Sequence, residues 1–195
     1  VICKLTLTSI MMLSTYLFFE MVLQVVEAVH YIHQKGVIHS DLRPENLLLH
    51  SDSKSKLNLL LCDFGGSTNG DIDGGHLPDS GFFNPCKPWV STEAVDIFSL
   101  GSVFYTIMTG HWPYKSPGPF RSVAEKNDYE ERVDSFASQK YPSVEGLTGG
   151  AVIQGCWTDR YSDVASLIRD QNLSFSAIEA SGDGHAIAQV AFNNM

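Results

Sequence analysis

The segment from Ala94 to Thr109 constrains the fold more than any other part of this chain. It carries one charge, Asp96, and its other residues are apolar or small. This pattern predicts a helix, and Gly110 and Pro113 just beyond it are residues that end helices. Because a helix that is apolar on every side is buried on every side, we expect the rest of the chain to pack around it.

Further elements precede and follow this helix. Apolar residues recur at helical spacing from Tyr16 to Gln34, which predicts a helix there. Three short apolar runs then indicate buried strands: Val37-Ile38, Leu47-Leu48-Leu49 and Leu57 to Cys62. The stretch from Asp63 to Trp89 is rich in Gly, Pro, Asn and Asp and is predicted to form one long loop. The later elements are a charged helix and two short helices: Val123 to Gln139, Gly150 to Trp157 and Ser162 to Gln171.

The composition bounds the class of protein. With 195 residues, of which 44% are apolar, the chain is long enough for one compact domain. Its net charge of -9 makes general nucleic-acid binding unfavourable, although a metal could offset that charge where a nucleotide binds. The four cysteines are far apart and form no CxxC pair, so we expect no zinc site and a reducing, cytoplasmic location.

The two ends of the chain differ from its middle. The stretch from Leu5 to Phe19 is uncharged but short for a membrane span, so a membrane partner is not expected. Residues 1–19 are left as an unassigned apolar segment, which is either a weakly specified helix or strand or sequence outside the domain. The tail, residues 176–195, is small and polar, and we expect it to be flexible.

Polar residues gather where the predicted strands end. Asp41, Arg43 and Asn46 lie in one loop between two of these strands, and Asp63 follows the third strand. The third strand is expected to pair with the strand that follows Asn46. Two carboxylates, an amide oxygen and a cation are therefore predicted to meet at one edge of a small sheet.

These residue types suit phosphoryl transfer. Carboxylate and amide oxygens are ligands that Mg²⁺ accepts together with phosphate oxygens. A second carboxylate can accept a hydroxyl proton, and an arginine can neutralise charge on phosphate oxygens. The set therefore fits transfer from a magnesium–nucleotide complex. Each residue also has a plainer interpretation, because Asp41 could cap a turn, Asn46 could end a strand and Asp63 could be a turn residue.

Three motifs in this order resemble the C-terminal lobe of a eukaryotic-type protein kinase. They are His39-Ser40-Asp41-Leu42-Arg43-Pro44-Glu45-Asn46, Asp63-Phe64-Gly65 and Asp96-Ile97-Phe98-Ser99-Leu100-Gly101. For residues 20–175 the resemblance implies an α+β, mainly α fold, a protein-kinase-like large lobe with a small β-hairpin sheet at the catalytic loop. It also implies ATP and Mg²⁺ as cofactors and a protein as substrate.

The same resemblance assigns candidate catalytic and binding roles. Asp41 would take or orient the proton of the substrate hydroxyl. Arg43 would lie near the γ-phosphate, where the family usually has Lys. Asn46 and Asp63 would bind magnesium and, through it, the nucleotide.

Other residues of these motifs are expected to serve structure. His39 would pack within the catalytic loop rather than act as a base. Asp96 corresponds to the family's buried helix aspartate, which holds the catalytic loop by its backbone. His76 and His111 are given no role.

The sequence departs from the family pattern at several points. No glycine-rich strand pair, strand lysine or helix glutamate can be placed, so the N-terminal lobe is expected to be missing from this chain, leaving apolar surface near Leu47 and Leu60. Ser40 stands where an arginine often precedes the catalytic Asp, so control by loop phosphorylation is not expected. Cys86 replaces a glutamate that pairs with Arg160 in the family, and Arg160 is therefore expected to lack that partner.

The sequence leaves two functions open. The first is that of a protein kinase domain, of which this chain is a fragment, and which when complete transfers the γ-phosphate of ATP to Ser or Thr hydroxyls of proteins. The pair Pro44-Glu45 resembles Ser/Thr kinases more than Tyr kinases. The alternative is a pseudokinase or truncated kinase remnant that acts only as a binding module. By itself, this chain is expected to bind ATP weakly and to be inactive.

Overall fold

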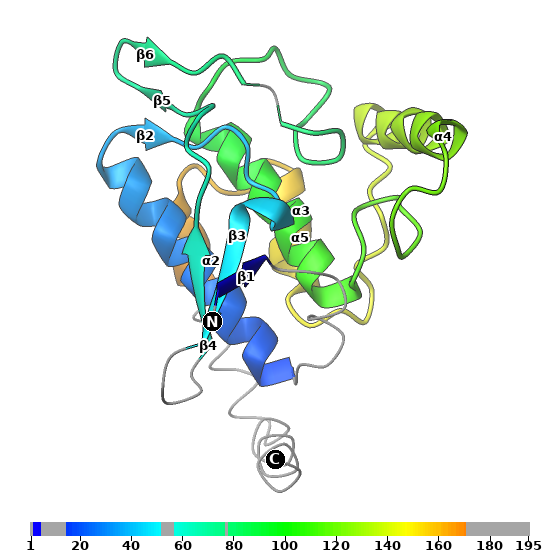
Figure 1. Ribbon diagram of the computed structural model, residues 1–195, viewed down its shortest axis with the longest axis horizontal. Helices are drawn as coiled ribbons and strands as arrows, with labels where there is room; N and C mark the ends of the chain where they lie inside the picture. The colour runs from blue at the N-terminus through cyan, green and yellow to red at the C-terminus, as the bar shows by residue number, and fades with distance from the viewer. Residues whose placement is uncertain (1, 5–14, 52–56, 77, 171–195) are drawn as a thin grey trace, which may run out of the picture.

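The computed structural model of the chain describes residues 2–4, 15–51, 57–76 and 78–170. More of these residues lie in helices than in strands, and the strands form two small three-stranded sheets (Figure 1). The architecture is therefore α+β and mainly α, as the sequence predicted. The flexible tail proposed at 176–195 and most of the segment 1–19 lie outside the described residues.

The apolar helix predicted from the sequence is α3 (Glu93–Thr109), and it runs through the middle of the molecule (Figure 1). Every residue from Asp96 to Ile107 is buried. The helix ends at Gly110, which has a φ of 77° and donates its backbone N–H to Thr106 O at 2.9 Å. A left-handed conformation at this position is one that glycine adopts at little cost.

Two further helices pack against α3. They are α2 (Thr15–Gln34) and α5 (Gly150–Trp157). At the α3–α5 contact the indole N–H of Trp157 donates to Ser102 Oγ at 3.0 Å, and the Trp157 ring stacks on Tyr141. The Trp157 side chain is fully buried, so this contact satisfies its one polar atom inside the core.

The first sheet has the order β1-β3-β4. Strands β3 (Leu47–Ser51) and β4 (Leu57–Leu61) form an antiparallel hairpin with Leu47 opposite Leu61. Strand β1 (Ile2–Lys4) joins the other edge of β3, with Ile2 opposite His50. The hairpin predicted from the apolar runs is thus confirmed, and its open end brings residue 46 next to residue 62.

The second sheet joins the predicted strand Val37-Ile38 to two strands inside the region that the sequence predicted to be one long loop. Strand β2 (Val37–Ile38) pairs with β5 (Thr68–Asn69), and β5 pairs with β6 (Ile72–Asp73). The loop prediction is corrected here, because β5 and β6 form a hairpin with a two-residue turn. Strands β5 and β6 contain a single strongly apolar residue, Ile72, so they form no apolar run that could be detected in the sequence.

The later elements follow the prediction with one change. The charged helix α4 (Val123–Val133) is shorter than predicted and continues as the 3-10 helix η2 (Asp134–Ser138). Helix α5 has the predicted bounds, and residues 164–170 are helical, within the last predicted helix. The domain boundary proposed between residues 19 and 20 falls inside α2.

Exposed apolar surface was expected near Leu47 and Leu60, but the two residues differ in how much of their surface is exposed. Leu47 is buried, with 1% of its surface exposed, whereas Leu60 is 44% exposed. The difference follows from the strand alternation, because neighbouring residues in paired strands face opposite sides of the sheet. Among the described residues, no helix combines the length and apolarity needed to cross a membrane.

Candidate functional site

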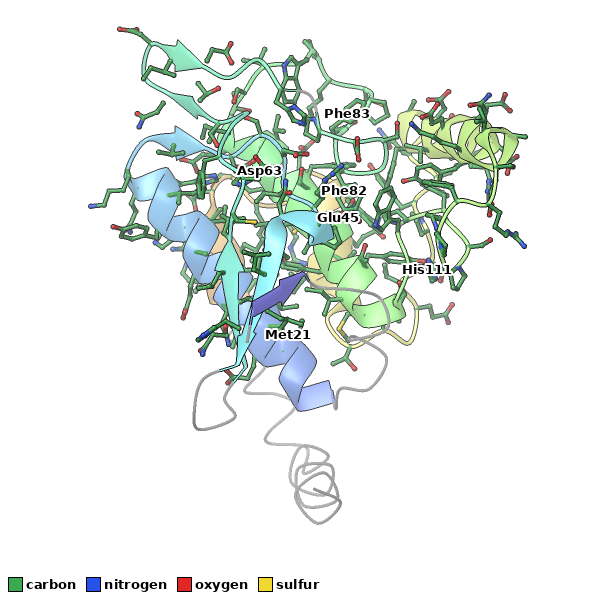
Figure 2. The ribbon with its side chains drawn as sticks, viewed as in Figure 1. Met21, Glu45, Asp63, Phe82, Phe83 and His111 are labelled. Atoms are coloured by element: carbon green, nitrogen blue, oxygen red, sulfur yellow. The ribbon has the colours of Figure 1, made fainter. Side chains whose placement is uncertain are left out.

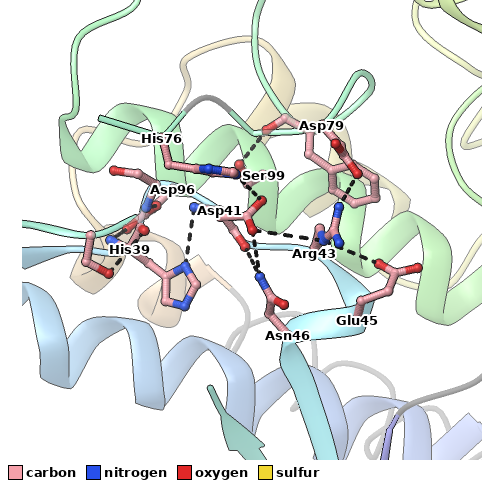
Figure 3. A network of polar contacts seen from close by, with 12 residues as sticks. His39, Asp41, Arg43, Glu45, Asn46, His76, Asp79, Asp96 and Ser99 are labelled. Atoms are coloured by element: carbon pink, nitrogen blue, oxygen red, sulfur yellow. Dashed lines mark hydrogen bonds and ion pairs between the residues drawn. The ribbon is translucent and has the colours of Figure 1, made fainter. Parts of the chain in front are cut away.

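The loop of residues 39–46, called the 39–46 loop below, is held in place by a buried carboxylate of α3. Asp96 is fully buried, and its Oδ2 and Oδ1 accept the backbone N–H groups of His39 at 2.8 Å and Ser40 at 2.9 Å (Figure 3). His33 Nε2 of α2 lies 2.8 Å from Asp96 Oδ2. One carboxylate therefore fixes the start of the loop to two helices.

His39 connects the 39–46 loop to the segment that follows β4. Its Nδ1 accepts the backbone N–H of Asp41 at 3.3 Å, and its Nε2 lies 3.0 Å from Cys62 O. Because Nδ1 accepts, the ring proton resides on Nε2 and is donated to the Cys62 carbonyl. The ring also packs edge-on against Phe64, with 5.0 Å between centroids. The His39 ring therefore lies between the 39–46 loop and residues 62–64.

Asp41 and Asn46 are in direct contact. Asn46 Nδ2 donates to the backbone oxygen of Asp41 at 2.8 Å and to Asp41 Oδ2 at 2.9 Å. Asp41 is 8% exposed, and its other carboxylate oxygen, Oδ1, is buried without a hydrogen bond to any described residue. The Nε2 atom of the His76 ring lies 3.4 Å from Oδ1. The amide thus orients the carboxylate and leaves one oxygen able to accept a proton.

Arg43 is surrounded by carboxylates. It forms an ion pair with Asp79, and its Nε lies 4.0 Å from Asp41 Oδ2 and 3.9 Å from Glu45 Oε2 (Figure 3). Burial raises the pKa of the Glu45 carboxyl, and the Arg43 charge opposes that shift. The cation predicted to meet phosphate is therefore present at the site, and three acidic side chains balance its charge.

Asp63 is placed at the site by its backbone. The preceding residue, Cys62, donates its backbone N–H to Asn46 O at 3.0 Å, which continues the β3–β4 pairing and brings Asp63 beside the 39–46 loop (Figure 2). Asp63 has a φ of 65°, an unusual value for a residue other than glycine. Its side chain is exposed and makes no hydrogen bond or ion pair with another described residue.

The structure brings the side chains of Asp41, Arg43 and Asn46 together and places Asp63 beside their loop through the backbone of Cys62. It adds three side chains that the sequence did not single out. These are Glu45, His76 and Asp79. Glu45 could have been predicted from the sequence, because it lies between the candidate residues Arg43 and Asn46. His76 was given no role, and neither it nor Asp79 has a local signal, because more than thirty residues separate each from its partner.

Arg160 forms its ion pair with a residue other than position 86. Cys86, which stands where the resemblance implied a glutamate, directs its Sγ to Ala137 O at 3.1 Å. Arg160 instead pairs with Asp170, with 3.3 Å between Nη2 and Oδ2. A carboxylate from a later helical segment therefore takes the place of the glutamate that Cys86 replaces.

The site offers oxygen ligands suited to a hard cation. Asn46 has an amide oxygen and Asp63 an exposed carboxylate, a set that fits Mg²⁺ if phosphate oxygens and water complete the coordination. Within the described parts of the chain, no group of three or more His, Cys, Asp or Glu could hold a metal by itself. The residues present therefore fit a metal that arrives with a phosphate-bearing ligand better than a resident metal.

Several known proteins are similar to this chain. The model of the family described as "Protein kinase domain" matches residues 4–140. The serine/threonine-protein kinase TOS3 of Saccharomyces cerevisiae is 30% identical over 172 residues, which are 77% of this chain and 28% of that protein. The calcium/calmodulin-dependent protein kinase cmkA of Emericella nidulans is 41% identical over 100 residues, 48% of this chain and 24% of that protein.

A solved structure shares the fold. The crystal structure of the Rad53 kinase domain and SCD2 superposes with a TM-score of 0.56 at 20% identity, covering 80% of this chain and 54% of that chain. The chain thus spans roughly half of that structure and about a quarter of the length of the curated relatives it matches.

Proposed function

The chain belongs to the protein kinase family, and from that premise we propose that it carries the phosphoryl-transfer residues of an ATP-dependent protein kinase acting on Ser or Thr hydroxyls. One observation carries the proposal. Asn46 holds one oxygen of the Asp41 carboxylate, while the other, Oδ1, is left without a hydrogen-bond donor among the described residues. A carboxylate prepared in this way suits acceptance of a hydroxyl proton.

Each candidate residue has a distinct task in the proposed reaction. Asp41 binds the substrate hydroxyl through Oδ1 and takes its proton as the oxygen attacks. Arg43 lies 4.0 Å from the same carboxylate and can neutralise charge on a neighbouring phosphate oxygen. Asn46 and Asp63 would hold Mg²⁺ through their side-chain oxygens. When bound, magnesium–ATP would supply the γ-phosphoryl group, with ADP as the leaving group, and the metal charge would reduce the repulsion that opposes the transfer.

The supporting residues keep this arrangement rigid. Asp96 binds two consecutive backbone N–H groups of the 39–46 loop, and His39 joins that loop to the segment before Asp63. Catalytic groups that are held rigidly lose little energy to reorganisation when the reaction occurs. The separated cysteines support our further proposal of a cytoplasmic location, where thiols stay reduced.

Phosphate transfer by the full-length protein tests the proposal. The assay measures transfer of labelled phosphate from ATP to a generic protein substrate, for the wild type and for Asp41→Asn. We expect Asp41→Asn to lower kcat by about 10²- to 10⁴-fold, because it removes the proton acceptor while keeping the shape of the side chain. The matched control is Asp71→Asn, at an exposed residue between β5 and β6, which should transfer phosphate as the wild type does.

A binding module without catalysis is the second candidate, and one observation favours it. Asp79 already pairs with Arg43, and Glu45 lies close to the same guanidinium, so the local charge available to attract phosphate is reduced. If the folded wild type and Asp41→Asn are equally inactive, and Mg²⁺–ATP raises the melting temperature of neither, the binding module is the better account.

A further inference from the structure

A short stretch beyond β6 lies against the 39–46 loop, and its path is set by close backbone packing. Gly74 donates its backbone N–H to Ser67 O at 3.1 Å. A Cβ atom added at Gly74 would lie 2.4 Å from the carbonyl carbon of Gly66, which no side chain tolerates. The His76 side chain also packs on Gly66. A Cβ atom added at Gly66 would lie 2.3 Å from His76 Cβ. The position of His76 is therefore determined by main-chain contact.

His76 meets the candidate proton acceptor. Its Nε2 lies 3.4 Å from Asp41 Oδ1, the carboxylate oxygen that Asn46 does not hold (Figure 3). The His76 side chain is 45% exposed, so one edge of the ring faces solvent while the other faces the carboxylate. The ring therefore borders the atom that would receive the substrate hydroxyl proton.

Asp79 meets the candidate phosphate-binding cation. It forms an ion pair with Arg43, whose side chain is 28% exposed. The residues just after Asp79 are anchored to the helical body, because Tyr129 donates its hydroxyl to Ser80 O at 2.7 Å and the Phe82 side chain is fully buried. The Asp79 carboxylate is therefore presented from a fixed piece of backbone.

We propose that His76 and Asp79 are positioning residues that together hold the 39–46 loop, an arrangement called the clamp. His76 orients Asp41, and Asp79 orients Arg43. The clamp needs no phosphorylated residue. The inference rests on the proposed function and concerns its regulation. Ser40 offers no cation to a phosphorylated residue, and its hydroxyl instead contacts Ser91 Oγ. Carboxylate and imidazole groups of the chain itself take the place of a phosphate contact.

The role proposed for Asp79 is tested by steady-state kinetics of the full-length protein. We expect Asp79→Asn to lower kcat about tenfold with an unchanged KM for ATP, since a small displacement of a catalytic group costs rate rather than affinity. Asp79→Glu, which keeps the carboxylate, should recover most of the rate. Asp71→Asn is the matched control. Equal kcat for Asp79→Asn and Asp71→Asn would overturn the proposal.

The role proposed for His76 is tested with a pair of variants in the same kinetic assay. His76→Gln keeps a polar group beside Asp41 Oδ1 and should retain most of kcat, whereas His76→Leu removes that group and should lower kcat about tenfold. The control is the same pair of changes at His111, whose Nδ1 contacts Trp112 O away from the site. If His76→Leu has the wild-type rate, His76 is not a positioning residue.

Hydrogen exchange separates failure of the clamp from failure of the proposed function. The backbone amides of residues 79–83 should exchange faster in Asp79→Asn than in the wild type, and should exchange at the wild-type rate in Asp71→Asn. Unchanged exchange overturns the clamp whatever the activity. Asp79→Asn could instead exchange faster while the wild-type protein transfers no phosphate. That result would overturn the kinase function, and the clamp would then be only a structural contact.

The phosphate-independent part of the proposal has its own test. Treatment of the full-length protein with a general phosphatase, followed by removal of that phosphatase, should leave kcat within about twofold, because no phosphate takes part in the clamp. A loss of activity that returns after phosphorylation would overturn it.

Discussion

At the scale of single residues, Asp96 fixes the backbone of the 39–46 loop, although it would not itself touch a substrate. Its two oxygens accept the backbone N–H groups of His39 and Ser40, and a ring nitrogen of His33 lies 2.8 Å from one of them. Ser40 has a φ of 67°, a conformation that is costly for serine. The carboxylate of Asp96 holds this strained residue and so fixes the backbone from which Asp41 projects.

We predict that Asp96→Asn lowers the free energy of unfolding by about 3 kcal/mol, because the new NH₂ group would face a backbone N–H inside the core. Urea denaturation of the wild type and the variant measures the difference. Asp128→Asn is the matched control, since Asp128 pairs with Arg132 on the surface and its side chain is 65% exposed. Similar losses for the two variants would contradict the role given to Asp96.

At the scale of elements, the crossing of α3 and α5 sets the position of the helix that carries Asp96. Gly101 lies at this crossing, and a Cβ atom added there would lie 2.7 Å from Cys156 Cβ. The Trp157 side chain contacts the same place, with its ring 3.1 Å from that added atom. A glycine is therefore required by the close approach of the two helices rather than by its own backbone conformation.

Gly101→Ala tests this contact. Alanine in a helix interior normally stabilises relative to glycine by about 1 kcal/mol. Here we expect a net loss of about 2 kcal/mol, because the added methyl group overpacks the α3–α5 contact. Thermal and urea unfolding both report the sign, and a more stable variant would show that the helices can separate to admit the methyl group.

At the scale of the whole molecule, buried groups that ionise at high pH tie stability to pH. Burial raises the pKa of the Cys156 thiol from its ordinary value of 9.0 and that of the Tyr129 phenol from 10.0. Cys156 lies on α5 and Tyr129 on α4, so both sides of the helical body contribute. Each group stays protonated in the folded chain at a pH where the unfolded chain has lost the proton.

The free energy of unfolding should therefore be constant below pH 9 as far as these groups are concerned and should fall above it. The unfolded state binds fewer protons there, and each group then contributes a fall of about 1.4 kcal/mol per pH unit. Urea denaturation at pH 8, 9, 10 and 11 measures the decline. In Cys156→Ala the fall should begin only near the ordinary tyrosine value of 10.0. A profile that does not change in this variant would contradict the burial of the thiol.

Much of the fold could be predicted from local pattern. The apolar run that became α3 and the helical spacing that became α2 each report burial along a single element. The 3-10 turn η1 (Pro44–Asn46) and the hairpin after it bring Asp41 and Asn46 together within one loop, so their contact followed from short spacing.

The sequence by itself determined the buried helix, the β3–β4 hairpin and the meeting of Asp41 with Asn46, because each depends on neighbours along the chain. Only the tertiary structure decided that β5 pairs with β2 and that His76 and Asp79 reach Asp41 and Arg43. Those contacts join residues at least thirty positions apart, through packing of main chain on main chain at Gly74. No local pattern encodes such packing, since its energy arises only when the whole molecule has folded.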